Sequence, residues 1–432
     1  MSIAILKPSP VVKTGELNHE FVKAYGKALA EPEWMTERRL EAFRVFRDTP
    51  APNRHDELWR RVDLSQFKLD ALLKAVDAKT NDVAMQMISP LSADELKAKG
   101  VVFADFATAV REHSDLIAKY LMADAVKITD SYFAAMHAMF MRGGVVLFVP
   151  AGVQIEAPFR TSSKMQSDQR TGFNHTLIVL EEGAKSTLIE DFGSPTPHPL
   201  PGAVGGGEQA MYNGAVEMLV AKGAHLDYVN VQDWGRNVYN FTTERAKVGE
   251  SAELHWVMGG IGGKFTKSLI ETDMNGANGL ALMSGVYYAD SKQQFHYDTQ
   301  QNHHGENCKS DLLYKSALRD SARTVWRGNI RVFPGAQKTD AYQANRNLQL
   351  SHLSRADSIP GLEIEADDVR CTHGATVGQI EAEPMFYLES RGMPPDEAKR
   401  LIVEGFFAPV IERIPLEETR VRLIEEIGKK IS

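Results

Sequence analysis

The residues in this chain best suited to chemistry are Cys371 and His373, which lie two positions apart. On an extended strand, alternate side chains point to the same face, so a thiol and an imidazole at this spacing would project side by side. Both groups are soft or borderline metal ligands, and Gly374 leaves room for another backbone or a ligand to approach. Spacing alone leaves two interpretations open: a two-ligand metal site, or a packed thiol beside a hydrogen-bonded histidine.

Cysteine is scarce in this chain, since Cys308 and Cys371 are the two cysteines among 432 residues. Iron–sulfur clusters are typically held by about four protein ligands, so the chain cannot complete a cluster alone. Any such chemistry would need ligands from a second chain. Two cysteines and the lack of an export pattern in Met1–Leu6 argue against a disulfide framework and favour a reducing, cytoplasmic location.

Two other groups of polar residues attract attention. His303 and His304 lie in a polar stretch close to Cys308. Adjacent histidines without a third spaced ligand favour a solvated loop over a metal site, and Cys308 is interpreted as a small buried residue. Asp367 and Asp368 would point to opposite faces of a strand, whereas the paired carboxylates of glycosidases face each other across roughly 5–10 Å. These two carboxylates therefore give little support to a β-helix enzyme that degrades polysaccharides, and that function is kept only as the less favoured alternative.

The glycine-rich run Gly259–Lys264 superficially resembles a phosphate-binding loop. Phe265 stands where Ser or Thr should bind magnesium, and Met258 stands where the first glycine is required, so these residues are interpreted as turn glycines. Any ATP requirement would then be met by a partner. The net charge of −8 argues against nucleic acid as a partner, and no apolar run approaches the roughly 18–20 residues of a membrane helix.

At 432 residues, two or three structural units are expected. Residues 1–140 are predicted to form an N-terminal helical domain. The run Glu33–Phe46 places apolar residues at helical spacing, with a start signal at Thr36. Further short helices are expected to begin near Asp94 and Asp105.

The sequence pattern of residues 141–385 predicts a mainly β structure. After the apolar run Val145–Pro150, helical periodicity is nearly absent up to Ile380, and short β-rich pieces alternate with turn residues. A turn residue, an alanine and alternating apolar positions recur at Gly183-Ala184, Gly223-Ala224, Ser251-Ala252, Gly276-Ala277, Ser321-Ala322, Gly335-Ala336 and Arg355-Ala356. The irregular intervals exclude propeller blades and favour a parallel β-helix, with a large sandwich or jelly roll as the alternative.

Residues 386–432 are predicted to form a C-terminal helical domain, with one helix beginning at Asp396 and another near Pro415. The first helix is expected to carry an apolar face made of Leu401, Ile402 and Phe406. Two interpretations are compatible with each other. The helices cap the end of the solenoid, or they present a docking surface to a partner protein.

Long strings in the C-terminal third carry a family resemblance, above all Phe333–Leu348, Leu362–Ile380 and Met385–Gly392. They resemble the SufB/SufD family of iron–sulfur cluster assembly proteins, and the similarity extends over most of the chain. The resemblance implies a right-handed parallel β-helix flanked by N-terminal and C-terminal α-helical domains. Gly374 and the run Asp367–Val369 resemble the SufD branch, because a Glu usually follows the histidine in SufB; a SufB-type scaffold is the alternative.

The resemblance further implies a non-catalytic subunit of the SufBCD complex, which pairs with SufB at a cluster-building interface, supports iron acquisition and docks the SufC ATPase. His373 falls on the motif histidine of that interface and is the candidate iron ligand shared with the partner. Cys371 falls on the neighbouring motif cysteine. No cofactor is expected to stay bound to the chain alone; iron or a transient iron–sulfur cluster would be held at the interface with SufB. Without SufB, a homodimer is expected.

Overall fold

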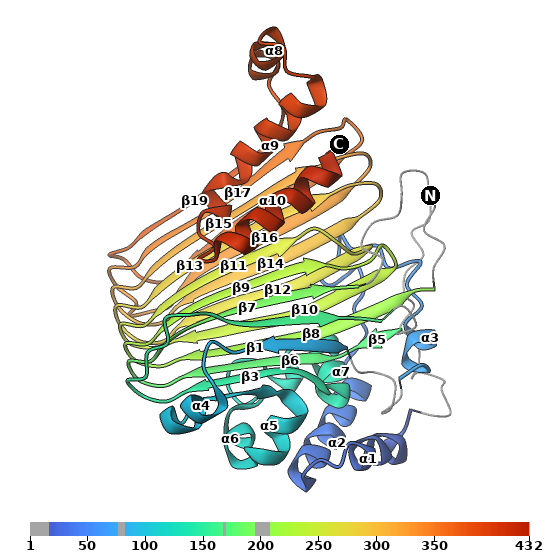
Figure 1. Ribbon diagram of the computed structural model, residues 1–432, viewed down its shortest axis with the longest axis vertical. Helices are drawn as coiled ribbons and strands as arrows, with labels where there is room; N and C mark the ends of the chain where they lie inside the picture. The colour runs from blue at the N-terminus through green and yellow to red at the C-terminus, as the bar shows by residue number, and fades with distance from the viewer. Residues whose placement is uncertain (1–16, 77–82, 167–169, 195–207, 432) are drawn as a thin grey trace.

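The computed structural model describes residues 17–76, 83–166, 170–194 and 208–431, and the segment Met1–Leu6 lies outside these ranges. Between residues 143 and 379 the chain winds as a β-solenoid in which successive strands alternate between two sheets (Figure 1). From β3 onward, the neighbouring described strands pair in parallel, whereas β1 and β2 join their sheets antiparallel. The predicted parallel β-helix is confirmed, and the sandwich alternative is wrong.

The two sheets are called sheet A and sheet B. Sheet A consists, in spatial order, of β1 (Ala84–Ile88), β4 (Phe159–Lys164), β7 (Lys185–Gly193), β9 (His225–Asp233), β11 (Glu253–Gly260), β13 (Leu280–Ala289), β15 (Lys309–Leu318), β17 (Asp340–Gln349) and β19 (Arg370–Gln379). Sheet B consists of β18 (Arg355–Ile364), β16 (Arg323–Val332), β14 (Gln294–His303), β12 (Phe265–Met274), β10 (Val238–Val248), β8 (Ala210–Val220), β6 (Asn174–Leu180), β3 (Gly143–Val149) and β2 (Val102–Asp105), with β5 (Thr171–Gly172) beside β8.

The turn–alanine pattern of the sequence marks corners of the solenoid. Gly183, Gly223 and Ser251 have φ angles of 67°, 64° and 54°, and each is followed by an alanine that is buried between the sheets. A left-handed turn residue reverses the chain, and a small side chain then fits the narrow corner of the core. The pattern does not hold everywhere: Arg355-Ala356 lies at the start of β18, inside a strand. The glycines that end β11 also lie in a strand, where a Cβ on Gly260 would collide with the Tyr297 hydroxyl.

The space between the sheets is filled by large side chains and by several buried carboxyls. Trp256 and Trp326 are buried in the same cluster as Tyr287, Tyr297 and Phe295. Among the polar groups of this interior are Glu190 and Glu244, and burial raises the pKa of each to about 7.

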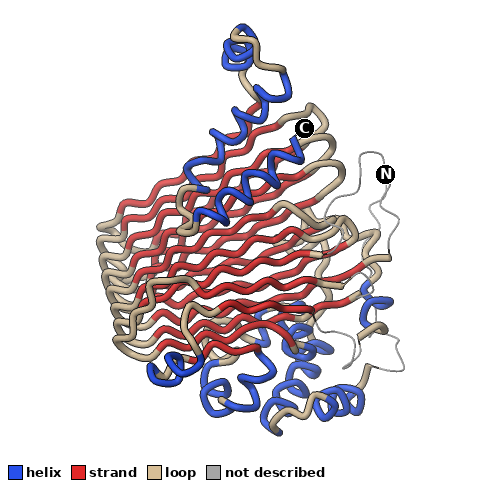
Figure 2. The backbone as a smooth tube through the Cα atoms, viewed as in Figure 1, coloured by secondary structure: helices blue, strands red, loops and turns tan. Residues whose placement is uncertain are grey.

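The N-terminal helices close one end of the solenoid and part of the outer face of sheet B (Figure 2). They are α1 (His19–Ala28), α2 (Glu33–Asp48), α3 (Leu69–Leu73), α4 (Ala93–Lys99), α5 (Phe106–Glu112), α6 (Ser114–Tyr120), the 3-10 turn η1 (Ile128–Asp130) and α7 (Tyr132–Phe140). α2 begins at Glu33 behind Pro32, three residues before the start predicted at Thr36. β1 and β2 also lie in this region, which the sequence analysis predicted to be helical.

The C-terminal helices are α8 (Ala382–Ser390), α9 (Pro395–Ile411) and α10 (Glu417–Ile431). α9 and α10 pack across the outer face of sheet A, so the prediction that they cap the solenoid end is wrong (Figure 1). The predicted apolar face of α9 is also displaced, because Leu401 is 46 % exposed while Val403 and Phe407 are buried. α8 extends away from the solenoid beyond the last strands. No described helix is both long enough and apolar enough to cross a membrane.

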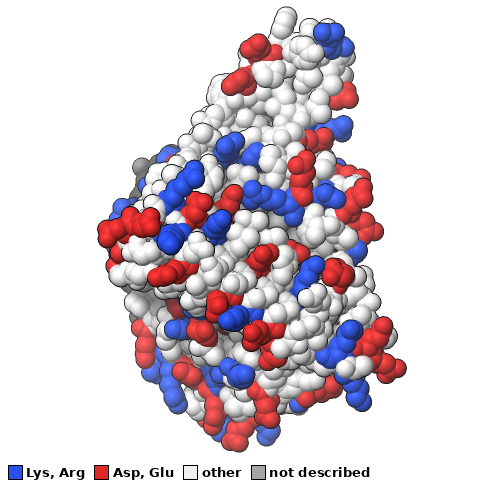
Figure 3. All heavy atoms as spheres, turned by 90° about the vertical axis from the view of Figure 1, so that its left-hand side faces the viewer, with Lys and Arg blue, Asp and Glu red and all other residues white. Residues whose placement is uncertain are grey.

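Charged side chains of both signs are mixed along the turn edge of the solenoid (Figure 3). Several of them form ladders between consecutive coils: Lys222 Nζ lies 3.0 Å from Glu250 Oε2, and Lys185 Nζ lies 3.0 Å from Glu156 Oε2. Exposed pairs of this kind contribute little free energy each, and their alternation keeps this edge free of a strong field of one sign.

Candidate functional site: the open end of the solenoid

The end of the solenoid opposite the N-terminal helices is uncovered in the described part of the chain. β19 pairs with β17 on one side and is the outermost strand of sheet A, while β18 is the outermost strand of sheet B. Most residues of β19 are exposed. An outer strand carries unpaired N–H and C=O groups that can extend the sheet with strands of another chain.

Cys371 and His373 lie on β19 in register with Ala341 and Gln343 of β17. Gln343 is fully buried, and its Nε2 donates a hydrogen bond of 2.9 Å to the carbonyl oxygen of Gly361 in sheet B. This face of the strand therefore points between the sheets. Residues paired across neighbouring parallel strands point to the same face of the sheet. Cys371 and His373 therefore lie side by side on the inner face of the last coil, roughly 6.6 Å apart along the strand.

The two side chains differ in their surroundings. Cys371 is half-buried against the last core cluster, which contains Ile330, Val332 and Ala341. Burial raises the pKa of its thiol, and the nearby Asp340 carboxylate acts in the same direction. The thiol is therefore protonated at neutral pH and would ionise only beside a metal ion or another cation. His373 is exposed, so its imidazole can reach a ligand without rearranging the core.

The comparisons with known proteins agree with this architecture. The SufBD core domain of the SUF system for FeS cluster assembly matches residues 161–406, and the SufBD protein N-terminal region matches residues 79–161. The chain belongs to the SufBD family. It is similar to the iron-sulfur cluster assembly protein SufD of Bacillus subtilis (strain 168), with 30 % identity over 96 % of this chain and 98 % of that protein. SufBD family proteins of Staphylococcus haemolyticus and Staphylococcus epidermidis are each 27 % identical over 93 % of this chain and 90 % of their own length.

This SufBD-family protein is thus a SufD-like protein of iron–sulfur cluster assembly, a family that is generally not catalytic. Family membership leaves the polysaccharide-degrading alternative without support. The geometry of the carboxylates agrees: Asp367 and Asp368 are exposed in the bend between β18 and β19, and not on a strand as the sequence analysis assumed.

The polar stretch around His303 is not a solvated loop throughout. His303 ends β14 inside the protein, where its Nε2 lies 2.9 Å from Ser310 Oγ and burial lowers its pKa to about 4. The prediction of a solvated loop is therefore wrong for this residue. His304 is exposed just after β14 and stacks on Phe333, with 4.1 Å between the two ring centroids. The buried Cys308 is confirmed, since its Sγ lies 3.1 Å from the carbonyl oxygen of Gly276.

Within this chain, neither a close contact nor the backbone conformation requires a glycine at position 374. A Cβ at this position would meet only the Tyr342 hydroxyl oxygen, at the ordinary contact distance of 3.5 Å. The backbone of Gly374 is not in the left-handed region either. Its small size therefore leaves space on the outer side of β19, next to His373.

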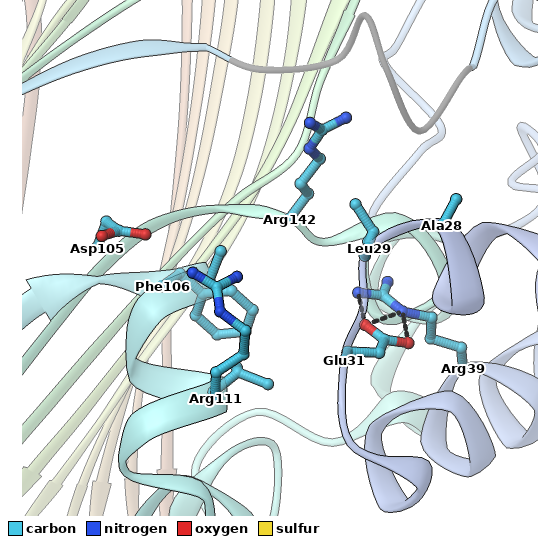
Figure 4. Close-up of a pocket in the computed structure, with 10 residues that line it drawn as sticks. Ala28, Leu29, Glu31, Arg39, Asp105, Phe106, Arg111 and Arg142 are labelled. Atoms are coloured by element: carbon cyan, nitrogen blue, oxygen red, sulfur yellow. Dashed lines mark hydrogen bonds and ion pairs between the residues drawn. The ribbon is translucent and has the colours of Figure 1, made fainter.

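A cavity of about 390 Å³ lies at the other end of the molecule, between α1, α2 and α5 (Figure 4). Its charged lining includes Arg39 and Glu31, which form hydrogen bonds of 2.8 Å with each other. This ion pair neutralises itself and ties α2 to the connection between α1 and α2, while Asp105, Arg111 and Arg142 add further charges to the wall.

One cluster of side chains with ligand chemistry is not evident from the sequence. Among the described residues, the group of histidines and acids compact enough to hold a metal ion is His225, Glu253 and His255. These residues come from two consecutive coils. The only sequence signal is a His-x-Asp at the start of β9 and a Glu-x-His at the start of β11, visible once the register is known.

Proposed function

We propose that this chain is the SufD-type, non-catalytic subunit of a SufBCD complex and that it pairs with SufB through the open end of its solenoid. The observation that carries this proposal is the uncovered inner face of β19, which presents Cys371 and His373 beside unpaired backbone groups. Strands of a partner solenoid would continue sheets A and B and enclose these two side chains. The same edge would support a homodimer when SufB is absent.

In this proposal, iron and sulfide are the cargo and the chain supplies part of their surroundings. His373 offers a ring nitrogen to iron while SufB provides the thiolates that this chain lacks. Cys371 is a conditional ligand, because its half-buried thiol must lose a proton before it binds metal. The division into residues 1–140, 141–385 and 386–432 is proposed to separate an N-terminal cap, the solenoid and a C-terminal docking unit.

We further propose that the SufC ATPase docks on α8. No residue of α8 is buried, and Phe386 and Tyr387 are 73 % and 57 % exposed. α9 connects this helix to the solenoid, where Lys315 Nζ of β15 donates a hydrogen bond of 2.6 Å to the carbonyl oxygen of Phe406. Arg413, just after α9, donates a hydrogen bond of 2.8 Å to Ser284 Oγ of β13. Movements of SufC would therefore be transmitted to sheet A near the partner interface.

Replacing His373 by alanine should lower de novo cluster assembly at least about tenfold, because a direct ligand matters at least as much as the outer-sphere groups that change metal affinity 10–100-fold. The exposed side chain makes no core contact, so stability should change by less than about 0.5 kcal/mol. The measurement is the activity of an iron–sulfur reporter enzyme in cells that depend on this pathway. His352→Ala removes another exposed histidine near the same end and should leave assembly unchanged. Wild-type assembly in His373→Ala would discard the ligand role.

Affinity purification from native cells should recover a SufB-like sister and a SufC-like ATPase.

In the same purification, the double substitution Phe386→Ala and Tyr387→Ala should remove the ATPase and retain the sister. Two exposed aromatic anchors at a docking site are each worth about 2 kcal/mol or more, roughly 30-fold in Kd. Val421→Ala, on the exposed side of α10, is the matched control. Deleting residues 396–432 would be less informative, because it would also expose the apolar face of sheet A. Retention of the ATPase by the double variant would place its docking site elsewhere.

A further inference from the structure

Four potential ligand side chains lie together on the outer face of sheet A, well away from the open end. β9 contributes His225 and Asp227, and β11 contributes Glu253 and His255. The register places His225 beside Glu253 and Asp227 beside His255. Intervening residues such as Leu226 are buried between the sheets, so these four side chains point outward.

The cluster is accessible but already ordered. It lies at the start of both strands, beside the turns, while the part of the same face covered by α9 and α10 lies further along the strands at Val229, Val231 and Val257. His225, Asp227 and His255 are half-buried and Glu253 is exposed. A solvated ion can therefore reach the cluster without opening the fold.

Asp227 accounts for the orientation of both imidazoles. Its Oδ1 lies 2.9 Å from His255 Nδ1 and 3.2 Å from His225 Nε2, and Thr187 Oγ1 donates to its Oδ2 at 3.3 Å. A carboxylate can only accept these hydrogen bonds, so the ring protons lie on His255 Nδ1 and His225 Nε2. The ring nitrogens that face away from Asp227 are then left to bind a ligand, namely His255 Nε2 and His225 Nδ1.

Glu253 completes the set, because its Oε2 lies 3.0 Å from His225 Nδ1. Without a metal ion this carboxylate accepts a hydrogen bond, so His225 Nδ1 carries a proton that a bound ion would displace. One ligand atom from each of His225, Glu253 and His255 lies within 4.8 Å of the other two. Ligand bonds of about 2.1 Å in a tetrahedral site would bring these atoms to about 3.4 Å, which small side-chain rotations on a rigid sheet can supply.

We propose that His225, Glu253 and His255 form a binding site for one divalent first-row transition-metal ion, with Asp227 as the positioning residue. Two imidazoles and one carboxylate are the donor set of open zinc sites and of non-haem iron(II) sites, whereas magnesium and calcium favour oxygen ligands alone. A carboxylate that fixes the tautomer of ligating histidines is a common accompaniment of such sites. Three protein ligands leave a coordination position for water.

This site is independent of the proposed cluster interface. In sheet A, three strands separate β11 from β19, which places the two regions about 19 Å apart at the usual strand spacing. The two histidine sites can therefore be removed separately by substitution, and the metal site stands or falls without the role proposed for His373.

The test uses the full chain without an affinity tag, stripped with a chelator and titrated with Co²⁺. One Co²⁺ per chain should bind, give the visible absorption of a low-coordinate nitrogen–oxygen site, and be displaced by Zn²⁺. His225→Ala combined with His255→Ala should abolish this absorption, and Asp227→Asn should weaken Kd by about 10–100-fold. His373→Ala should bind Co²⁺ as the wild type does, and so should His55→Ala, which removes an exposed histidine between α2 and α3.

Two results would overturn the proposal. One is the absence of stoichiometric binding by the correctly folded wild-type chain. The other is an unchanged Co²⁺ spectrum in the double histidine variant. Thermal unfolding without metal checks folding of each variant. Metal addition should raise the Tm of the wild type, His373→Ala and His55→Ala but not that of the double histidine variant, since the ion binds the folded state. Loss of the spectrum in His373→Ala with retention in the double variant would move the metal to the open end and reject the site.

Discussion

Replacing Arg39 by methionine should lower the free energy of unfolding by about 3–5 kcal/mol. Arg39 is 1 % exposed and is the cation of a buried pair with Glu31, with Nε and Nη2 each 2.8 Å from a carboxylate oxygen. Its guanidinium also donates to the carbonyl oxygens of Met139 and Met141, at 3.0 and 2.8 Å. One side chain thus connects α2 with the end of α7 and with the chain that enters the solenoid.

The large effect comes from what the substitution leaves behind. Without Arg39, the buried carboxylate of Glu31 keeps the Thr36 hydroxyl at 3.1 Å but has lost its cation, and two buried carbonyl oxygens lose donors. A buried unpaired charge is costly, whereas replacing both members of a buried pair by neutral groups is often close to neutral. The double variant Arg39→Met and Glu31→Gln should therefore recover much of the lost stability.

Urea denaturation followed by circular dichroism measures this change. Arg47→Met is the matched control, since Arg47 pairs with Asp48 on the surface of the same helix and should change stability by less than about 0.5 kcal/mol. A loss below about 1 kcal/mol in Arg39→Met would show that water reaches Glu31 through the adjoining cavity and replaces the arginine.

The solenoid could be predicted from the sequence because its corners impose a local rule. A turn residue that tolerates positive φ, followed by a small side chain, appears at Gly183, Gly223 and Ser251, and the structure uses all three as corners. That Cys371 and His373 share one face of a strand also follows from local geometry, since side chains on a strand alternate with a period of two residues. That their shared face is the inner one, at an uncovered end, could not be deduced before the strands had a spatial order.

Non-local features account for what the sequence analysis missed. Amphipathic spacing indicates that α9 has an apolar face, but the choice of Val403 and Phe407 over Leu401 depends on the surface it meets, which is sheet A. The cluster of His225 and Glu253 is hidden for the same reason, because these residues are 28 positions apart and meet only through the register of β9 and β11. In a solenoid, side chains one coil apart are spatial neighbours.

The buried carboxyls of the solenoid interior should make the protein less stable as the pH rises from about 4.5 to above 7. Burial raises the pKa of Glu190 and Glu244 to about 7, although Tyr228 Oη donates to Glu190 at 2.8 Å and Asn230 Nδ2 donates to Glu244 at 3.0 Å. In the unfolded chain a glutamate titrates near pH 4.3. The folded state therefore binds more protons between these values, and the free energy of unfolding falls with pH by up to about 3 kcal/mol per carboxyl.

Glutamine at both positions retains a neutral polar group of the same shape and removes the titration. Relative to the wild type, the double variant Glu190→Gln and Glu244→Gln should have similar stability near pH 4.5 and should be more stable by several kcal/mol at pH 8. Buried histidines such as His303, whose pKa is lowered to about 4, titrate with the opposite sign, but they contribute equally to both proteins and cancel in the difference.

Urea denaturation at pH 5, 6, 7 and 8 measures the difference in stability between the wild type and the double variant, with Glu250→Gln at the exposed turn edge as the control. Parallel pH profiles of the wild type and the double variant would contradict the prediction, and would mean that both carboxyls are ionised inside the solenoid with water among the side chains. Divergent profiles would establish that the narrow interior stays uncharged below pH 7, so that the tight packing around Trp256 and Trp326 tolerates these carboxyls because they enter it protonated.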